Sequence, residues 1–412
     1  MTSRDPSGPV RAAAPPAIAV FGATGVVGRR VCELLAWPEP GGGARCEVRL
    51  VGRRRDALAA LAAALPAGAA RIAEAETGDA DALIRGFAGA RVVVNAAGPL
   101  RDTAEPVLAA ALAAGAHYVD VGGEQAVLRA LYERCESAVR RAGLVALPGA
   151  GVDPALGDLA AAWAAAQICA TGDPRDPTAP GEPADDRAGD PVRSAPAPRL
   201  AEDRPFDEIA VAYAFDDLVL SAGSQRALFG AIGERALIWR RDRWEPGRAG
   251  DHRPINPGSA LGGERDAVGY AGGAVITLPR HVAADLVGAY LSTTRDPTAA
   301  AALRVLARAL PLLPRRARGV LAPYAAPDAD YAATQLAVVA QVRRGFSAAQ
   351  IVVRGRDLYH TTAAIAAWSA RRLAERGPGP IGMRAPGELF HAESALRAIA
   401  SAADLTIEPS FG

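Results

Sequence analysis

The chain contains 412 residues, half of them hydrophobic, and its formal net charge at pH 7 is only +1. This balance gives no electrostatic argument for a nucleic-acid partner or for an anionic membrane surface. The sequence contains no lysine, so all 46 basic residues are arginine. Catalysis through a lysine Schiff base, a Walker lysine on a phosphate and the tyrosine–lysine pair of short-chain dehydrogenases are therefore excluded.

The sequence also lacks the signals of an exported, metal-binding or membrane protein. Its four cysteines are far apart, without a C-x-x-C pair, and indicate buried thiols in a reducing compartment with neither disulfides nor a metal site. Residues 1–16 form a polar, proline-bearing tail, predicted to be disordered, without the apolar core of a signal peptide. No run of about 18 uncharged apolar residues occurs, so we expect a cytoplasmic protein without a membrane span.

Apolar segments and alanine-rich helical segments alternate from residue 17 to residue 150. This alternation is typical of a doubly wound parallel sheet. The sequence therefore predicts an α/β protein whose residues 17–150 form a Rossmann domain. The predicted strands are residues 17–21, 46–51, 71–75, 91–97, 117–121 and 144–148, and helical stretches such as 56–65 and 105–115 lie between them.

The remainder of the chain is less regular. Residues 151–170 predict a connecting helix, and residues 171–205 predict a disordered insert because they cannot bury enough apolar surface. Residues 206–364 predict a second domain with a mixed sheet and helices, and residues 365–412 predict further helices and then a short tail. The expected strands of the second domain are residues 207–215, 235–244, 272–279 and 349–355, and its expected helices are residues 297–313 and 361–375.

A glycine motif, G-x-x-G-x-x-G, lies between the first predicted strand and the first predicted helix. In such a motif the first glycine permits a tight turn, the second lets the backbone approach a pyrophosphate, and the third permits close packing of helix and strand. The helix that starts at Val26 would point its free N–H groups at that phosphate. The residues predicted to bind the pyrophosphate are Gly22, Thr24, Gly25, Val26, Val27 and Gly28.

The end of the second predicted strand distinguishes between the two nicotinamide cofactors. NAD-binding proteins usually carry a carboxylate there, whereas this chain has Arg53 and Arg54, which favours the 2′-phosphate of NADP. Asp79, after the third strand, is predicted to meet the adenine, with a helix N-cap as the alternative. The small residues after the fourth strand would let the chain pass close to the ribose and nicotinamide, and they are Ala96, Ala97 and Gly98.

Candidates for proton transfer follow the last strands of the predicted Rossmann domain. Strand alternation places Tyr118 and Asp120 on one side of their strand, where Tyr118 would donate a proton and Asp120 would either orient it or hold a substrate amine. The alternative is that Tyr118 belongs to the core and that Asp120 accepts hydrogen bonds from the backbone. Asp153 precedes Pro154, so it is predicted either to contact the substrate or to cap a helix.

Five segments together resemble the saccharopine dehydrogenase-like oxidoreductases, including the trans-acting enoyl reductase branch. They are GATGVVG, VGRRRDAL, VVVNAAGPL, HYVDVGGE and ALPGAGVDPALGDLAA, in the order of the family. The resemblance implies a Rossmann domain with an inserted α/β domain for substrate binding and dimerisation, with the last helices returning to the first domain. It also implies a homodimer and NAD(P)-linked hydride transfer to a C=N or C=C bond. Lysine-forming members use an active-site lysine, so we do not expect that activity here.

Two functions are consistent with these residues. The first is an NADPH-dependent oxidoreductase that acts on a C=N or C=C bond of a small molecule. The second is a non-catalytic NADP(H)-binding sensor or scaffold. A deep pocket lined by Tyr118 or Asp120 would favour the enzyme, whereas a pocket filled by Asp153 or by the chain itself would favour the sensor. A nucleotide-sugar epimerase is disfavoured because its usual tyrosine–lysine pair is missing.

Overall fold

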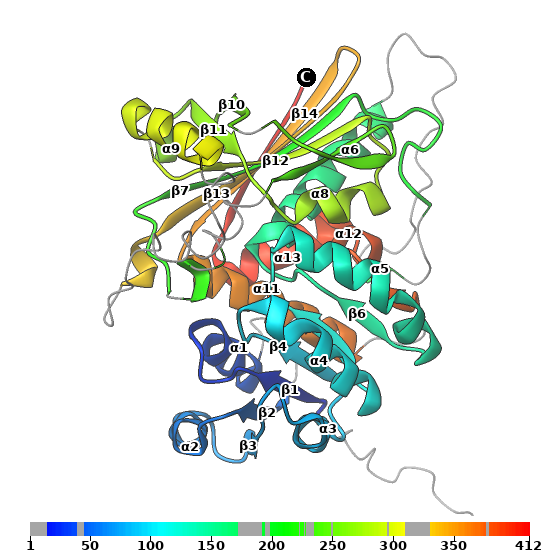
Figure 1. The fold of residues 1–412 in the computed structure, drawn as a ribbon, viewed down its shortest axis with the longest axis vertical. Helices are drawn as coiled ribbons and strands as arrows, with labels where there is room; N and C mark the ends of the chain where they lie inside the picture. The colour runs from blue at the N-terminus through cyan, green and yellow to red at the C-terminus, as the bar shows by residue number, and fades with distance from the viewer. Residues whose placement is uncertain are drawn as a thin grey trace, which may run out of the picture.

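Two β-sheets, stacked along the long axis of the molecule, organise the chain (Figure 1). The computed structural model describes residues 15–38, 45–171, 192–193, 198–221, 223–225, 227, 235–248, 250–294, 296–309, 330–375 and 379–412. The predicted tail, apart from its last two residues, and most of the predicted insert at residues 171–205 lie outside the described residues. Across the part of the chain that is described, no helix has the length and apolar character needed to cross a bilayer.

The first sheet has seven parallel strands in the order β15-β6-β5-β4-β1-β2-β3. The α/β fold and the six strands predicted before residue 150 are confirmed. Central strands such as β4 are buried along their whole length, as expected for a parallel sheet covered on both faces. The strands are β1 Ala17–Phe21, β2 Glu47–Gly52, β3 Ala70–Glu74, β4 Val92–Asn95, β5 His117–Asp120, β6 Val145–Leu147 and β15 Gly382–Met383.

Helices follow the strands of this sheet and leave it at its carboxyl edge. They are α1 Val26–Ala36, α2 Arg55–Ala64, α3 Ala80–Phe87, α4 Leu100–Ala113 and α5 Gln125–Arg141. After β6, a π-helical turn at Val152–Leu156 leads into α6 Gly157–Thr171. Because α6 packs against β13 and β14 of the second sheet, this helix joins the two halves of the molecule.

The second sheet has nine strands and is mixed, with β7 and β12 parallel and the other pairs antiparallel. Its strands are β7 Glu208–Asp216, β8 Leu237–Arg240, β9 Arg243–Pro246, β10 His252–Ile255, β11 Arg265–Gly269, β12 Leu286–Ser292, β13 Gln335–Arg344, β14 Ser347–Arg356 and β16 Thr406–Phe411. Helix α9 Pro297–Ala309 packs on β11. The chain ends beside β14 (Figure 1).

Three expectations for the second half are wrong. Residues 235–244, predicted as one strand, form the antiparallel strands β8 and β9 with a turn at Arg241 and Asp242, both of which have positive φ. Residues 272–279, predicted as a strand, form the helix α8 Ala274–Thr277 and a 3-10 turn at Leu278–Arg280. This run is buried on all sides, so it carries no periodicity that separates strand from helix. The predicted tail after the last helix forms the edge strand β16. It pairs with β14, which lies more than 50 residues earlier in the sequence.

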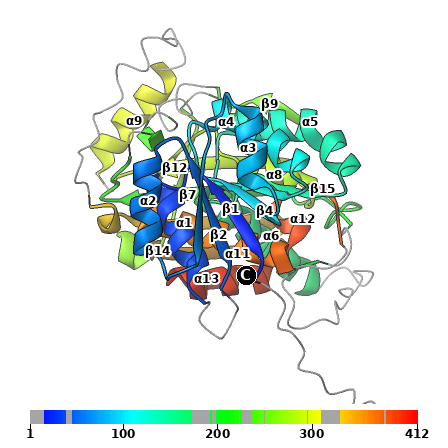
Figure 2. The ribbon, with the colours of Figure 1, turned by 90° about the horizontal axis from the view of Figure 1, so that it is seen from below.

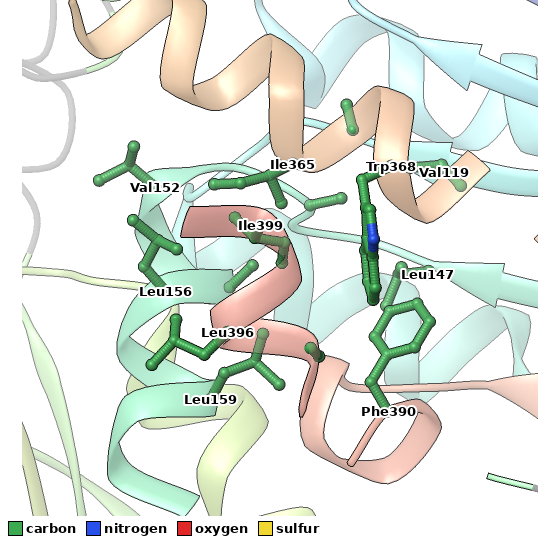
Figure 3. Packing of buried hydrophobic residues seen from close by; sticks show 14 of the residues in the cluster. Val119, Leu147, Val152, Leu156, Leu159, Ile365, Trp368, Phe390, Leu396 and Ile399 are labelled. Atoms are coloured by element: carbon green, nitrogen blue, oxygen red, sulfur yellow. The ribbon is translucent and has the colours of Figure 1, made fainter. Parts of the chain in front are cut away.

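The last part of the chain contacts both halves. Helix α11 Leu358–Glu375 packs against α1, and Figure 2 shows the two helices on the same side of the sheet. Helices α12 Pro386–Leu389 and α13 Ala392–Ala403 pack on α6. Figure 3 shows the buried cluster at this junction, where Trp368 of α11 meets Phe390 edge to face at 4.8 Å. This core packs the first sheet against the elements that carry the site.

Candidate functional site

The turn between β1 and α1 has the shape that a pyrophosphate requires. Gly22 has φ +79°, and a Cβ there would lie 2.8 Å from the backbone nitrogen of Ala97. A Cβ on Gly28 would collide with the carbonyl oxygen of Gly22. Gly25 caps α1 without a side-chain hydrogen bond, and the first turn of α1 contains no acidic residue. The helix N-terminus therefore keeps its N–H groups available, and the residues fit the cofactor phosphates.

The opposite wall of this turn is the segment after β4, which is shaped by the buried side chain of Asn95. The Asn95 carboxamide accepts from the N–H of Ala97 at 3.1 Å and donates to the hydroxyl groups of Thr103 at 3.3 Å and Tyr118 at 3.2 Å. Thr103 donates in turn to the carbonyl of Ala97 at 2.6 Å. These bonds present Ala96, Ala97 and Gly98 to a cleft of about 360 Å³, which the turn before α1 also lines.

The residues predicted to select the cofactor lie at the carboxyl edge of the sheet. Arg53 and Arg54 follow β2 directly, and both side chains are exposed. Asp79 follows β3 and caps α3, since its carboxylate accepts from the N–H of Ala82 at 2.8 Å. The capping alternative for Asp79 is thus present, while the contacts of these three residues with the cofactor stay predictions.

Tyr118 and Asp120 lie beneath the cleft and not in its wall. Both side chains are buried, and neither is among the described residues that line the cleft. Burial raises the pKa of Tyr118 well above its usual range. Asp120 accepts from the N–H groups of Gly122 at 3.0 Å and Gly149 at 2.9 Å, while burial raises its pKa to about 6. The pair therefore shapes the loop after β5, and its catalytic role stays a prediction.

Asp153 occupies the position where chemistry can take place. Its carboxylate accepts from the hydroxyl groups of Tyr213 at 2.9 Å and Tyr270 at 2.5 Å and from the N–H of Gly273 at 3.0 Å. Burial raises the pKa of Asp153 to about 6, and these donors oppose the rise. Burial and the nearby charge of Asp153 raise the pKa of both tyrosines well above the usual range. The hydroxyl groups therefore stay protonated and keep donating to the carboxylate.

The two tyrosines come from the second sheet, and sequence reasoning missed them. Tyr213 lies on β7 and Tyr270 follows β11, so they are 60 and 117 residues from Asp153. A faint signal exists at Gly157, where a Cβ would lie 2.6 Å from the Tyr213 hydroxyl oxygen. A glycine near the start of an apolar helix marks a close approach, but it does not identify the approaching residue.

A second cleft, of about 210 Å³, opens beside the first and shares Asp153 and Glu124 with it. Most of its wall is apolar or aromatic. Its described lining residues are Gly123, Glu124, Val152, Asp153, Tyr213, Phe215, Leu218, Leu220, Ser224, Ala227, Tyr270, Ala271, Leu291 and Leu358. Asp153 therefore stands between a cofactor-shaped cleft and an apolar cleft.

The family description "Saccharopine dehydrogenase NADP binding domain" matches residues 18–147, which are the first sheet and its helices up to β6. No curated protein matches the chain. A saccharopine dehydrogenase (L-Glu forming) from Saccharomyces cerevisiae has a similar fold at 13% identity and a TM-score of 0.58, over 96% of this chain and 100% of that chain.

Two further solved structures match a smaller part of the chain. The triphenylmethane reductase of Citrobacter sp., complexed with NADP(H), is 22% identical over 32% of this chain and 48% of its own, with a TM-score of 0.26. An NADPH-dependent quinone oxidoreductase from Escherichia coli is 23% identical over 36% of this chain and 54% of its own, with a TM-score of 0.27.

Proposed function

We propose that the protein is an NADPH-dependent oxidoreductase acting on a C=N or C=C bond of a small molecule, because residues 18–147 match the family model of the saccharopine dehydrogenase NADP-binding domain. The single observation that carries the proposal is the position of Asp153, which lines both the cofactor-shaped cleft and the apolar cleft. A substrate in the second cleft would lie next to a nicotinamide in the first. Hydride transfer requires mainly this alignment.

NADPH supplies the hydride when it is bound. The chain then has three tasks, which separate residues perform. The turn around Gly22 and Gly28 holds the pyrophosphate, and the segment around Ala97 leaves room for the ribose and nicotinamide. The apolar side chains of the second cleft would pack against an apolar part of the substrate. Asp153, whose pKa is raised to about 6, holds a proton or a positive charge beside the reacting atoms.

The alternative of an NADP(H) sensor is less consistent with the clefts. A sensor would have the substrate space occupied by Asp153 or by the chain. Asp153 lines both clefts without filling either of them. Its carboxylate accepts hydrogen bonds from Tyr213 and Tyr270. The sequence predicts that Tyr118 or Asp120 lines the pocket, whereas in the structure Asp153 lines both clefts. The open space supports an enzyme.

Titration of the purified protein with NADPH and NADH, followed by nicotinamide fluorescence, tests the cofactor half of the proposal. We expect NADPH to bind at least tenfold more tightly, because charge-assisted hydrogen bonds to the 2′-phosphate contribute roughly 1.5–3 kcal/mol. Replacing both Arg53 and Arg54 by Ala should remove this preference and leave NADH binding unchanged. Arg91→Ala is the matched control, since Arg91 is exposed but precedes β4 at the opposite edge of the sheet.

The catalytic half is tested by following NADPH consumption with a panel of imines and enoyl thioesters. Asp153→Asn should lower kcat by about 10²–10⁴-fold, the range for loss of a positioned acid or base, while NADPH affinity is retained. Failure of both NADPH and NADH to bind would overturn the proposal. Binding without turnover of any compound in the panel, in a protein whose clefts accept those compounds, would favour the sensor.

A further inference from the structure

We infer that the apolar cleft takes a small apolar cation, a protonated imine without a carboxylate or phosphate group, whose positive charge is held by Asp153. The inference rests on the proposed function and narrows it from C=N or C=C bonds to C=N bonds. It also defines the charge of the substrate. The lining of the clefts, the hydrogen bonds of Asp153 and the nearby aromatic rings support it.

The charged side chains among the described residues that line the two clefts are acidic. Among their described lining residues, the only charged side chains are the acids Glu124 and Asp153. Arg101 and Arg134 line a third cleft between α4 and α5, and they are paired with Glu124 at 3.8 Å and Glu105 at 2.9 Å. Glu124 is thus compensated by Arg101, and the charge that a ligand in the apolar cleft would meet is that of Asp153, which repels an anion and attracts a cation.

The Asp153 carboxylate is held by hydrogen bonds and has no cationic partner among the described residues. Three groups donate hydrogen bonds to its carboxylate, and within the described ranges no arginine forms an ion pair with it. Hydrogen bonds stabilise this half-buried carboxylate but do not neutralise its charge. A bound ammonium or iminium group would supply the missing counter-charge.

Aromatic rings provide a second attraction for the same charge. Tyr213 and Tyr270 meet edge to face with ring centroids 5.8 Å apart, and both line the apolar cleft beside Asp153. A cation over such rings gains roughly 0.5–2 kcal/mol from the ring quadrupole. The hydroxyl groups of the same rings are held by Asp153, so the ring orientation is fixed before a ligand arrives.

Hydride transfer to a protonated imine needs no general acid, so Asp153 can take part in its ionised form. The imine carbon accepts the hydride, the π electron pair of the C=N bond moves to nitrogen, and the product is a neutral amine beside oxidised NADP⁺. No proton has to reach carbon in this step, and the amine afterwards takes a proton from solvent. Reduction of a C=C bond would instead require an acid that protonates the second carbon. Asp153 in its carboxylate form keeps the imine nitrogen protonated, which makes the imine carbon a better hydride acceptor.

Three ligands of matched shape and different charge test the inference on the NADP⁺-loaded protein by isothermal titration calorimetry. They are cyclohexylmethylamine, cyclohexylmethanol and cyclohexanecarboxylate. We expect the amine to bind at least tenfold more tightly than the alcohol, and the carboxylate to bind most weakly. Asp153→Asn should reduce amine affinity to the level of the alcohol and leave alcohol affinity unchanged. Glu105→Gln, which alters only the third cleft, is the control and should leave the amine unaffected.

Acidification gives a second readout on the wild-type protein. The amine stays protonated, so its affinity should fall as Asp153 is protonated near pH 6, while the affinity for the alcohol stays constant. Equal binding of amine and alcohol, or tighter binding of the carboxylate, would overturn the inference. The three-ligand comparison decides this even if Asp153→Asn does not fold.

The failure of the inference and the failure of the proposed function have different signatures. Turnover of an enoyl thioester with NADPH, without preferential amine binding, would overturn the cationic substrate and leave the oxidoreductase in place. Preferential amine binding without NADPH binding would overturn the oxidoreductase, and with it the assignment of the cation as a substrate.

Discussion

Gly28 lies where α1 passes the carbonyl oxygen of Gly22, and this residue shows how closely the cofactor turn is packed. A Cβ at this position would collide with backbone atoms, which cannot move aside as a flexible side chain can. We therefore expect Gly28→Ala to destabilise the protein by roughly 1–3 kcal/mol, the usual range for overpacking. NADPH affinity should fall at least tenfold because the turn has to shift.

Urea unfolding and NADPH fluorescence titration of the Gly28→Ala variant measure the two effects. Gly269→Ala is the control, because the nearest atoms to its Cβ would lie at 3.5 Å, an ordinary contact distance, in the second sheet. Wild-type NADPH affinity in Gly28→Ala would contradict the assignment of this turn to the pyrophosphate.

The raised pKa of Asp120 predicts how the stability of the protein depends on pH. Its pKa in the folded protein is about 6, above the value of 3.8 for an unperturbed aspartate, so the folded state binds the proton more tightly than the unfolded state. Stability from this group is then highest below pH 3.8 and is lost as pH rises towards 6. A shift of about two units corresponds to roughly 3 kcal/mol.

Asp120→Asn should remove this dependence, since the amide oxygen can still accept from Gly122 and Gly149 but carries no charge. The free energy of unfolding in urea, measured at about pH 4 and about pH 7, should fall less in the variant than in the wild type. A stability difference between the two proteins that is the same at both pH values would contradict the raised pKa. Asp153 contributes in the same direction to both proteins and cancels in the comparison.

At the scale of elements, strands β7 and β11 are tied across β12 by a buried ion pair. Arg265 donates to the carboxylate of Asp216 at 2.6 Å, and the two side chains are 5% and 8% exposed. Asp216→Ala would leave the guanidinium buried without this partner, and we expect a loss of about 3–5 kcal/mol in urea unfolding. The double variant Asp216→Leu with Arg265→Met should recover most of the loss. A single variant as stable as the wild type would show that the pair is not desolvated.

Prolines protect two edge strands of the second sheet, β10 and β16, against pairing with another chain, while β9 forms a further edge beside β8. Pro254 lies within β10 at one edge, and Pro409 lies within β16 at the other. Proline cannot donate to a ladder and is a common means of blocking an edge strand. The homodimer that the family resemblance implies stays a prediction, and we expect any such dimer to use a surface other than these edges.

At the scale of the whole molecule, Arg371 of α11 ties the C-terminal part of the chain to the cofactor domain. Its guanidinium donates to the carbonyl oxygens of Leu34 and Trp37 at 2.6 Å each, at the C-terminal end of α1. This arginine satisfies carbonyl groups that the helix leaves open, and its charge suits the negative end of the helix dipole. Arg371 is more than 330 residues from both Leu34 and Trp37 in the sequence.

We expect Arg371→Met to destabilise the protein by about 2–4 kcal/mol, because two hydrogen bonds to a charged group are lost at a buried position. Thermal unfolding measures the effect. Arg85→Ala, at an exposed position on α3, should change stability by less than about 0.5 kcal/mol. If the two variants unfolded alike, the contact between α11 and α1 would not depend on Arg371.

The cofactor domain could be read from the sequence because its signals are local. Buried parallel strands are short continuous apolar runs, glycines mark the turns, and consecutive strand–helix units pack in a standard order, so six strands and the turn at Gly22–Gly28 followed from patterns within a few residues. The absence of lysine likewise excluded several mechanisms without any structure.

The reaction side of the site was decided by tertiary structure alone. Tyr213, Tyr270 and Gly273 meet Asp153 through contacts between segments 60 to 120 residues apart, and nothing near any of these residues specifies such a meeting. For the same reason local patterns predict a strand at residues 272–279, where the chain is helical, and a tail at residues 406–411, where it forms β16. Local sequence determines which backbone a segment favours, but the side chains that share a cleft depend on how distant segments pack, and that free energy is a property of the whole fold.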